Sequence, residues 1–324
     1  QPQIEYKQLQ QIHVPVLVLA GEFDMIDAKD TDHIGESLPY GIVKIIQHGN
    51  HFLLRDAFQE TVKEISLFLE ACHQEENYEC MSSSTIEGKP KVCIPVVETT
   101  TSSILKQIQF LQSYLFDIIE LRIDFYQDIH DLQKVQDLLM QIRNQTEKPL
   151  LLTYRSAREG GQIQLSDEAY LALVKTACQS QCIDMIDVEL MSGNVLVCQM
   201  VDIAHQNHVK VLMSYHDFEQ TPKIQEMKQY LENMEILGAD LCKIAVMPHR
   251  YQDVVDLLNI TMEMSHRLSR PIVTMSMGSI GKISRIVGEL TGSAMTFASV
   301  NQASAPGQMA VEDLQKLLEV IHHD

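Results

Sequence analysis

The chain has 324 residues, 45% of them hydrophobic, with a formal net charge of −19 and a pI near 5.0. That length suffices for one large domain with a smaller unit beside it. The acidic charge argues against nucleic acid and anionic membranes as partners. The sequence has neither an apolar run long enough to span a membrane nor a secretory signal, so we expect a cytoplasmic protein. Its seven cysteines lack paired zinc-type spacing, and we expect reduced thiols and no metal site.

Residues 1–75 have a pattern of their own, with apolar strands expected at 14–20 and 41–46 and a helix from about residue 58. The segment resembles the C-terminal end of an α/β-hydrolase fold, and that resemblance makes Asp24 the acid and His51 the base of a triad. No Gly-x-Ser-x-Gly motif occurs in the sequence to supply the nucleophile. We therefore expect a catalytically silent fragment, or a segment that docks a missing portion of the fold or a partner. Residues 76–89 are polar, lack periodicity and are expected to form a linker.

From residue 90 onward, short apolar and β-branched runs recur at regular spacing, separated by segments with helical periodicity. The eight expected strands are 91–97, 117–124, 149–155, 184–190, 210–217, 241–247, 271–277 and 294–299. Eight β–α units over residues 90–324 predict an α/β fold, a (β/α)₈ TIM barrel whose site lies at the carboxyl ends of the strands. A large doubly wound sheet also fits the periodicity.

One lysine, Lys243, stands inside the apolar run 238–248. Burial of a lysine disfavours its ammonium form and makes the free amine available as a nucleophile. Alternatively, the side chain extends to a strand end or pairs with a carboxylate. The preceding strand ends at His216, a residue that titrates near neutrality. If these strands are neighbours in a parallel sheet, the two side chains meet at one edge, which favours imine chemistry on a carbonyl substrate.

The second expected strand carries two charged residues on one face, because Glu120 and Arg122 alternate with Leu121. We expect both to point into the barrel, as substrate contacts or as a structural ion pair. Arg155 ends the third expected strand, where a guanidinium suits a substrate carboxylate or a cluster of hydroxyl groups. Arg285 follows the seventh expected strand and is a second candidate for a carboxylate; alternatively, it is a solvated arginine early in a helix.

The loop after the last expected strand is polar and contains a Pro-Gly turn, so it is a candidate lid over the site. Within it, Ser304 and Gln308 are the groups that the loop offers to a hydroxylated ligand.

Six segments in order resemble type I 3-dehydroquinate dehydratase: Glu-Leu-Arg-Ile-Asp, Arg-Ser-Ala-Arg-Glu-Gly-Gly, Asp-Met-Ile-Asp-Val-Glu-Leu, Ser-Tyr-His-Asp-Phe, Lys-Ile-Ala-Val-Met-Pro and Ala-Ser-Ala-Pro-Gly-Gln. The resemblance implies a barrel enzyme of the shikimate pathway that converts 3-dehydroquinate to 3-dehydroshikimate through an imine. It implies that Lys243 forms the imine, that His216 moves protons and that Glu159 is a carboxylate beside the histidine. The substrate-binding positions that it implies are Glu120, Leu121, Arg122, Arg155, Arg285, Ser304 and Gln308.

The resemblance further implies a homodimer that needs no metal or dissociable cofactor. One position departs from the family, because Pro95 stands where some members carry a binding serine, and Glu98 is a candidate replacement. Another imine-forming barrel enzyme, of the aldolase type, is the alternative within catalysis. A non-catalytic fusion derived from a hydrolase is the alternative outside it.

Overall fold

The computed structural model describes residues 9, 16–26, 28–38, 41–75, 88–300 and 305–322. The chain divides into two compact units, Gln1–Met81 and Ser82–Asp324. Most of the predicted linker at 76–89 lies outside the described residues, so the boundaries 1–75 and 90–324 stay predictions. In the described part of the chain, no helix combines the length and the apolar content that crossing a membrane requires.

The first unit is built on two parallel strands, β1 (Val16–Gly21) and β2 (Gly41–Ile46). Its helices are α2 (Ala28–Ser37), α3 (Leu53–Asp56) and α4 (Phe58–Glu75). Because β1 and β2 are parallel, the loops that follow them lie at the same edge, and these loops carry Asp24 and His51.

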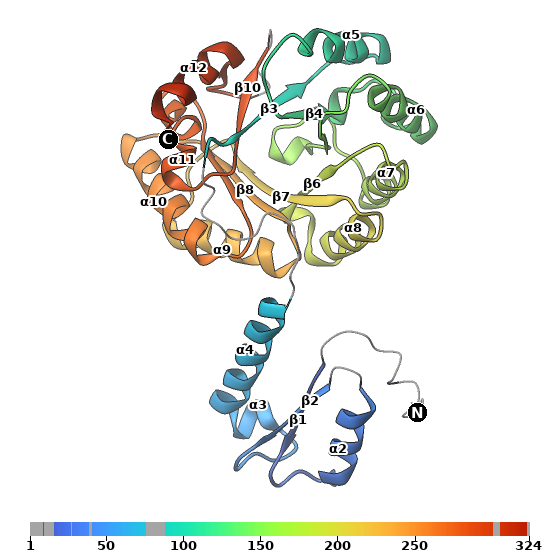
Figure 1. The fold of residues 1–324 in the computed structure, drawn as a ribbon, viewed down its shortest axis with the longest axis vertical. Coiled ribbons are helices and arrows are strands. Elements are labelled where there is room, and N and C mark those ends of the chain that lie inside the picture. Colours follow the sequence, from blue (N-terminus) through green and yellow to red (C-terminus); the bar gives the residue numbers. More distant parts are fainter. Residues whose placement is uncertain are drawn as a thin grey trace. The chain divides into compact units, whose positions relative to one another are not determined.

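The second unit is a ring of parallel strands surrounded by helices (Figure 1). Its eight main strands are β3 (Lys91–Val96), β4 (Ile118–Arg122), β5 (Leu150–Thr153), β6 (Met185–Glu189), β7 (Lys210–Asp217), β8 (Leu241–Val246), β9 (Ile272–Ser276) and β10 (Met295–Ser299). Strands β3 to β9 pair in chain order, and β10 pairs with β3. A bridge between Ile272 and Ser293 links the segment before β10 to β9. The predicted (β/α)₈ barrel is thus confirmed, and the doubly wound alternative is wrong.

The surrounding helices are α5 (Thr101–Leu111), α6 (Leu132–Arg143), α7 (Asp167–Gln179), α8 (Asn194–Gln206), α9 (Ile224–Ile236), α10 (Tyr251–Arg267), α11 (Gly288–Thr291) and α12 (Val311–Ile321). Helix α5 illustrates why they form where they do. The Thr100 side chain accepts a hydrogen bond from the Ser103 backbone N–H and caps the first turn. Ile104, Ile108 and Leu111 then recur at helical spacing and are buried against the sheet.

Side chains alternate along each strand between the barrel interior and the helix layer. Ile118, Leu151 and Leu212 face inward and belong to the apolar cluster that fills the barrel. Residues two positions further along the same strands therefore also face inward, nearer the carboxyl end. Leu121 faces outward instead and packs in the cluster between sheet and helices, so the structure does not bring its side chain to the interior.

Candidate active site

A cavity opens at the carboxyl ends of the barrel strands. Eight of the predicted site residues line it: Glu120, Arg122, Arg155, Glu159, His216, Lys243, Arg285 and Gln308. Ser304 lies outside the described residues. Leu121, Pro95 and Glu98 are not among the described residues that line the cavity, so the structure gives no support for Glu98 as a replacement contact.

Lys243 projects from β8 into this cavity and is only 4% exposed. Burial lowers the pKa of its amine, although the negative charges of Glu120 and Asp187 oppose that shift. Its Nζ lies 4.3 Å from the ring centroid of Phe297 and 3.9 Å from Asp187 Oδ2, too far for a direct hydrogen bond. The amine therefore does not extend to solvent, and burial shifts its protonation equilibrium toward the neutral form.

His216 lines the same cavity from the neighbouring strand β7, where it pairs with Ala245 of β8. Its Nδ1 lies 3.1 Å from Glu159 Oε2, which also accepts the His216 backbone N–H at 3.1 Å. Burial and the positive charges of Arg155 and Lys243 lower the pKa of the imidazole well below its usual value. The ring is therefore neutral near pH 7 and able to accept a proton.

Glu159 comes from the short 3₁₀ turn Ala157–Glu159 after β5 and is 5% exposed. Burial is the main cause that raises the pKa of its carboxyl group to about 8; the charge of Arg155 opposes the shift and the neighbouring carboxylate of Glu189 adds to it. Its second oxygen, Oε1, is buried without a hydrogen-bond partner among the described residues. A carboxyl group that titrates near neutrality beside the imidazole can take part in proton movement.

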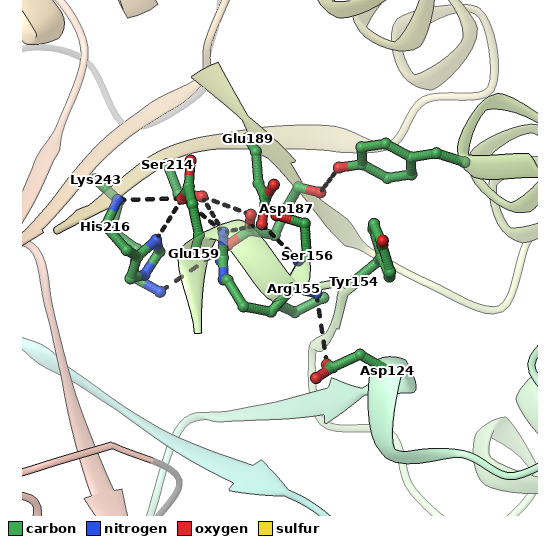
Figure 2. Close-up of polar contacts among 12 residues, drawn as sticks. Asp124, Tyr154, Arg155, Ser156, Glu159, Asp187, Glu189, Ser214, His216 and Lys243 are labelled. Atoms are coloured by element: carbon green, nitrogen blue, oxygen red, sulfur yellow. Dashed lines mark hydrogen bonds and ion pairs between the residues drawn. The ribbon is translucent and has the colours of Figure 1, made fainter. Parts of the chain in front are cut away.

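Arg155 lies at the centre of a buried polar network (Figure 2). Nη1 donates to Glu159, Glu189 and Ser214 at 3.3, 3.0 and 3.0 Å, and Nη2 donates to Asp187 at 2.6 Å. Burial alone would lower the pKa of Arg155, but the surrounding carboxylates outweigh it and raise the pKa. The guanidinium is thus held by protein carboxylates and fixes their positions.

Arg285 is equally buried, at 1% exposure, but has a different environment. Its Nη2 donates to the Pro306 carbonyl at 3.1 Å, and its Nη1 lies 3.6 Å from Met275 Sδ. Nε has no hydrogen-bond partner among the described residues. Burial lowers the pKa of this guanidinium to about 10. A buried guanidinium whose described contacts include no carboxylate is chemically suited to bind an anionic group.

Glu120 and Arg122 both line the cavity from β4, as the alternation predicts, but they do not form the ion pair considered as the alternative. Arg122 binds Asp124 in bidentate fashion, through Nε at 2.8 Å and Nη2 at 2.9 Å. Glu120 Oε1 accepts a hydrogen bond from Thr153 at 2.9 Å.

The sequence reasoning missed the acidic residues Asp187 and Glu189 of β6, which hold Arg155 from inside the barrel. They stand two positions apart, as Glu120 and Arg122 do, so the same alternation would have identified them. It also missed the apolar part of the cavity wall, formed by Phe218, Met275, Met277 and Phe297.

Comparisons with known proteins agree with this geometry. The sequence model described as Type I 3-dehydroquinase matches residues 92–324. The 3-dehydroquinate dehydratase of Listeria monocytogenes serotype 4a is 45% identical over 237 residues, which cover 73% of this chain and 94% of that protein.

Among solved structures, type I 3-dehydroquinate dehydratase from Clostridium difficile is 42% identical, with a TM-score of 0.71, and the match covers 73% of this chain and 94% of that one. The enzyme from Enterococcus faecalis is 37% identical, with a TM-score of 0.69, over 73% of this chain and 96% of the other. This chain therefore belongs to the type I 3-dehydroquinase family, and its barrel is a 3-dehydroquinate dehydratase, a hydro-lyase.

Proposed function

We propose that the barrel eliminates water from 3-dehydroquinate through an imine formed on Lys243, with His216 as the group that moves protons. The observation that carries this proposal is a buried amine in the same cavity as a neutral imidazole. The Clostridium difficile relative was solved with covalent modified comenic acid, which supports covalent chemistry in a cavity of this kind.

The Lys243 amine adds to the substrate ketone, and loss of one water leaves an iminium. The iminium withdraws electrons and acidifies the adjacent carbon, whose proton passes to His216. Nδ1 faces Glu159, so Nε2 is the atom available to accept this proton. The resulting enamine expels the hydroxyl group, and the imidazolium returns the proton so that water leaves. Hydrolysis of the conjugated iminium releases the enone product and regenerates the amine.

We assign the substrate carboxylate to Arg285, because it is the buried cation whose described contacts include no carboxylate. Five further residues are proposed to bind and orient the ring hydroxyls of the substrate: Glu120, Arg122, Arg155, Gln308 and Ser304. Glu159 is proposed to orient His216 through Nδ1 and to support its protonated state.

An assay that follows formation of the conjugated enone from 3-dehydroquinate tests this function directly. The account expects turnover without added metal or cofactor, and reductive trapping of the substrate on Lys243. Turnover without a trapped adduct would remove the imine from the mechanism.

For the first unit, we propose a hydrolase-like segment that is catalytically silent. His51 Nδ1 lies 2.9 Å from Asp24 Oδ1, as in the acid and base of a triad, but no nucleophile motif accompanies them. An ester-hydrolysis assay of the whole protein should therefore give no activity above that of the variant His51→Ala.

The family resemblance further leads us to propose a homodimer in the cytoplasm. Sedimentation equilibrium on the whole chain tests the oligomeric state, and a mass equal to one chain would contradict the dimer.

A further inference from the structure

Asp187 is a fully buried carboxylate of β6 that the proposed mechanism has not used. Its Oδ2 accepts a hydrogen bond from Arg155 Nη2 at 2.6 Å, and its Oδ1 accepts one from Ser214 Oγ at 2.6 Å. The same Oδ2 lies 3.9 Å from Lys243 Nζ (Figure 2). Two short hydrogen bonds therefore fix this carboxylate within ion-pair range of the amine, although no hydrogen bond joins the two groups.

Imine chemistry makes two opposed demands on the nitrogen of Lys243. The amine must be neutral to attack the ketone, and burial favours its neutral form. The iminium that follows carries a positive charge that it must keep until the proton on the adjacent carbon has been removed. The burial that favours the amine also penalises this cation, unless a fixed negative charge lies close to it.

We propose that Asp187 is the counter-ion of the iminium on Lys243 and fixes its orientation, an inference that rests on the imine mechanism proposed above. The ring of Phe297, 4.3 Å from Nζ, provides a second favourable contact for a cation. Glu120 has the larger electrostatic effect on the pKa of Lys243, but among the described residues it forms no ion pair with Nζ. Asp187 is the carboxylate that the structure places in ion-pair range of Nζ.

The competing explanation is that Asp187 only holds Arg155 in place. Glu189 provides a matched control, because it lies on the same strand, is 1% exposed and accepts a hydrogen bond from Arg155 at 3.0 Å. In the described part of the chain Glu189 forms an ion pair with Arg155 and none with Lys243, whereas Asp187 Oδ2 lies 3.9 Å from Lys243 Nζ. Each of the variants Asp187→Asn and Glu189→Gln removes one carboxylate that pairs with Arg155. Only Asp187→Asn also removes a negative charge beside Lys243.

The experiment measures the rate at which cyanoborohydride traps 3-dehydroquinate on the whole protein, as a function of pH, for the wild type and both variants. The negative charge of Asp187 favours the ammonium form, so its removal should lower the pH midpoint of trapping by roughly one unit. Loss of the counter-ion should also lower kcat by roughly 10- to 100-fold, with a smaller change in KM. Glu189→Gln should leave the midpoint at the wild-type pH.

Equal pH midpoints for Asp187→Asn and the wild type would overturn the proposal, as would an equal shift in both variants. If Asp187→Asn does not fold, Ser214→Ala tests the same point, because it keeps the charge and removes the 2.6 Å hydrogen bond that orients it. We expect Ser214→Ala to turn over several-fold more slowly, with an unchanged pH midpoint of trapping. Turnover at the wild-type rate would contradict the role of Asp187 as an oriented counter-ion. Absence of any adduct in active wild-type protein is a separate outcome, which would overturn the imine mechanism itself.

Discussion

Glu159 Oε2 lies 3.1 Å from both the backbone nitrogen and the ring Nδ1 of His216. One carboxyl group thus fixes the position of the strand end and the orientation of the imidazole. With Nδ1 directed at Glu159, Nε2 is the remaining ring nitrogen, and in the proposed mechanism it exchanges protons with the substrate.

The raised pKa of Glu159 predicts how stability depends on pH. In the folded protein this pKa is about 8, against an ordinary value of 4.5. The proton is therefore bound more tightly in the folded state, and the resulting stabilisation is fully present below pH 4.5 and lost as pH rises through 8. Glu159→Gln stays uncharged, so its melting temperature relative to the wild type should rise between pH 5 and pH 8.5.

Glu168 is a control for that measurement, because it is exposed and its backbone N–H and Ser166 lower the pKa of its carboxyl group. Glu168→Gln should show no such relative rise. A difference between Glu159→Gln and the wild type that stays constant with pH would show that Glu159 titrates at its ordinary value.

The sequence predicts the barrel well and the inside of the site less well. Strands such as β8 are evident because an apolar, β-branched run must be buried, and Lys243 and His216 are evident because they interrupt such runs. The sequence does not predict the surroundings of Arg155. It lines the cavity as expected, but three carboxylates from other turns and strands also engage it, and no local pattern predicts that convergence.

Arg285 is more deeply buried than its position in the sequence indicates. Its position after a strand is compatible with a solvated arginine, yet it is 1% exposed and packs against Pro306 and Met275. Whether an arginine is buried depends on how the loop at 305–308 folds over it, and this contact is distant in sequence.

Arg285→Ala should chiefly weaken substrate binding. Removing the buried cation takes away the group proposed to receive the substrate carboxylate, so KM should rise by roughly 10-fold or more with a smaller effect on kcat. Steady-state kinetics on 3-dehydroquinate measures both. The control variant Arg158→Ala, which removes an exposed arginine, should keep the wild-type KM. An unchanged KM in Arg285→Ala would show that Arg285 does not bind the substrate carboxylate.

His216→Ala should separate imine formation from elimination. The amine of Lys243 remains, so the substrate should still be trapped by borohydride, whereas turnover should fall by roughly 10²- to 10⁴-fold because the proton acceptor is gone. Mass spectrometry and the enone assay on the same sample give the two quantities. Near-normal turnover would show that another group moves the proton.

Removing the first unit should spare catalysis, because every described residue that lines the cavity lies between residues 120 and 308. A chain that begins at Met81 should be folded and should keep the kcat and KM of the whole protein. Circular dichroism checks the fold, and loss of activity in a folded chain would show that the first unit contributes to the site.

The most direct test of the central claim is the mass of the protein after reduction with borohydride in the presence of 3-dehydroquinate. The account predicts one adduct per chain on the peptide that contains Lys243, and none in Lys243→Ala, while Lys210→Ala, changed at the opposite end of the neighbouring strand β7, is labelled like the wild type. Active protein that shows no adduct, or an adduct on a different lysine, would contradict it.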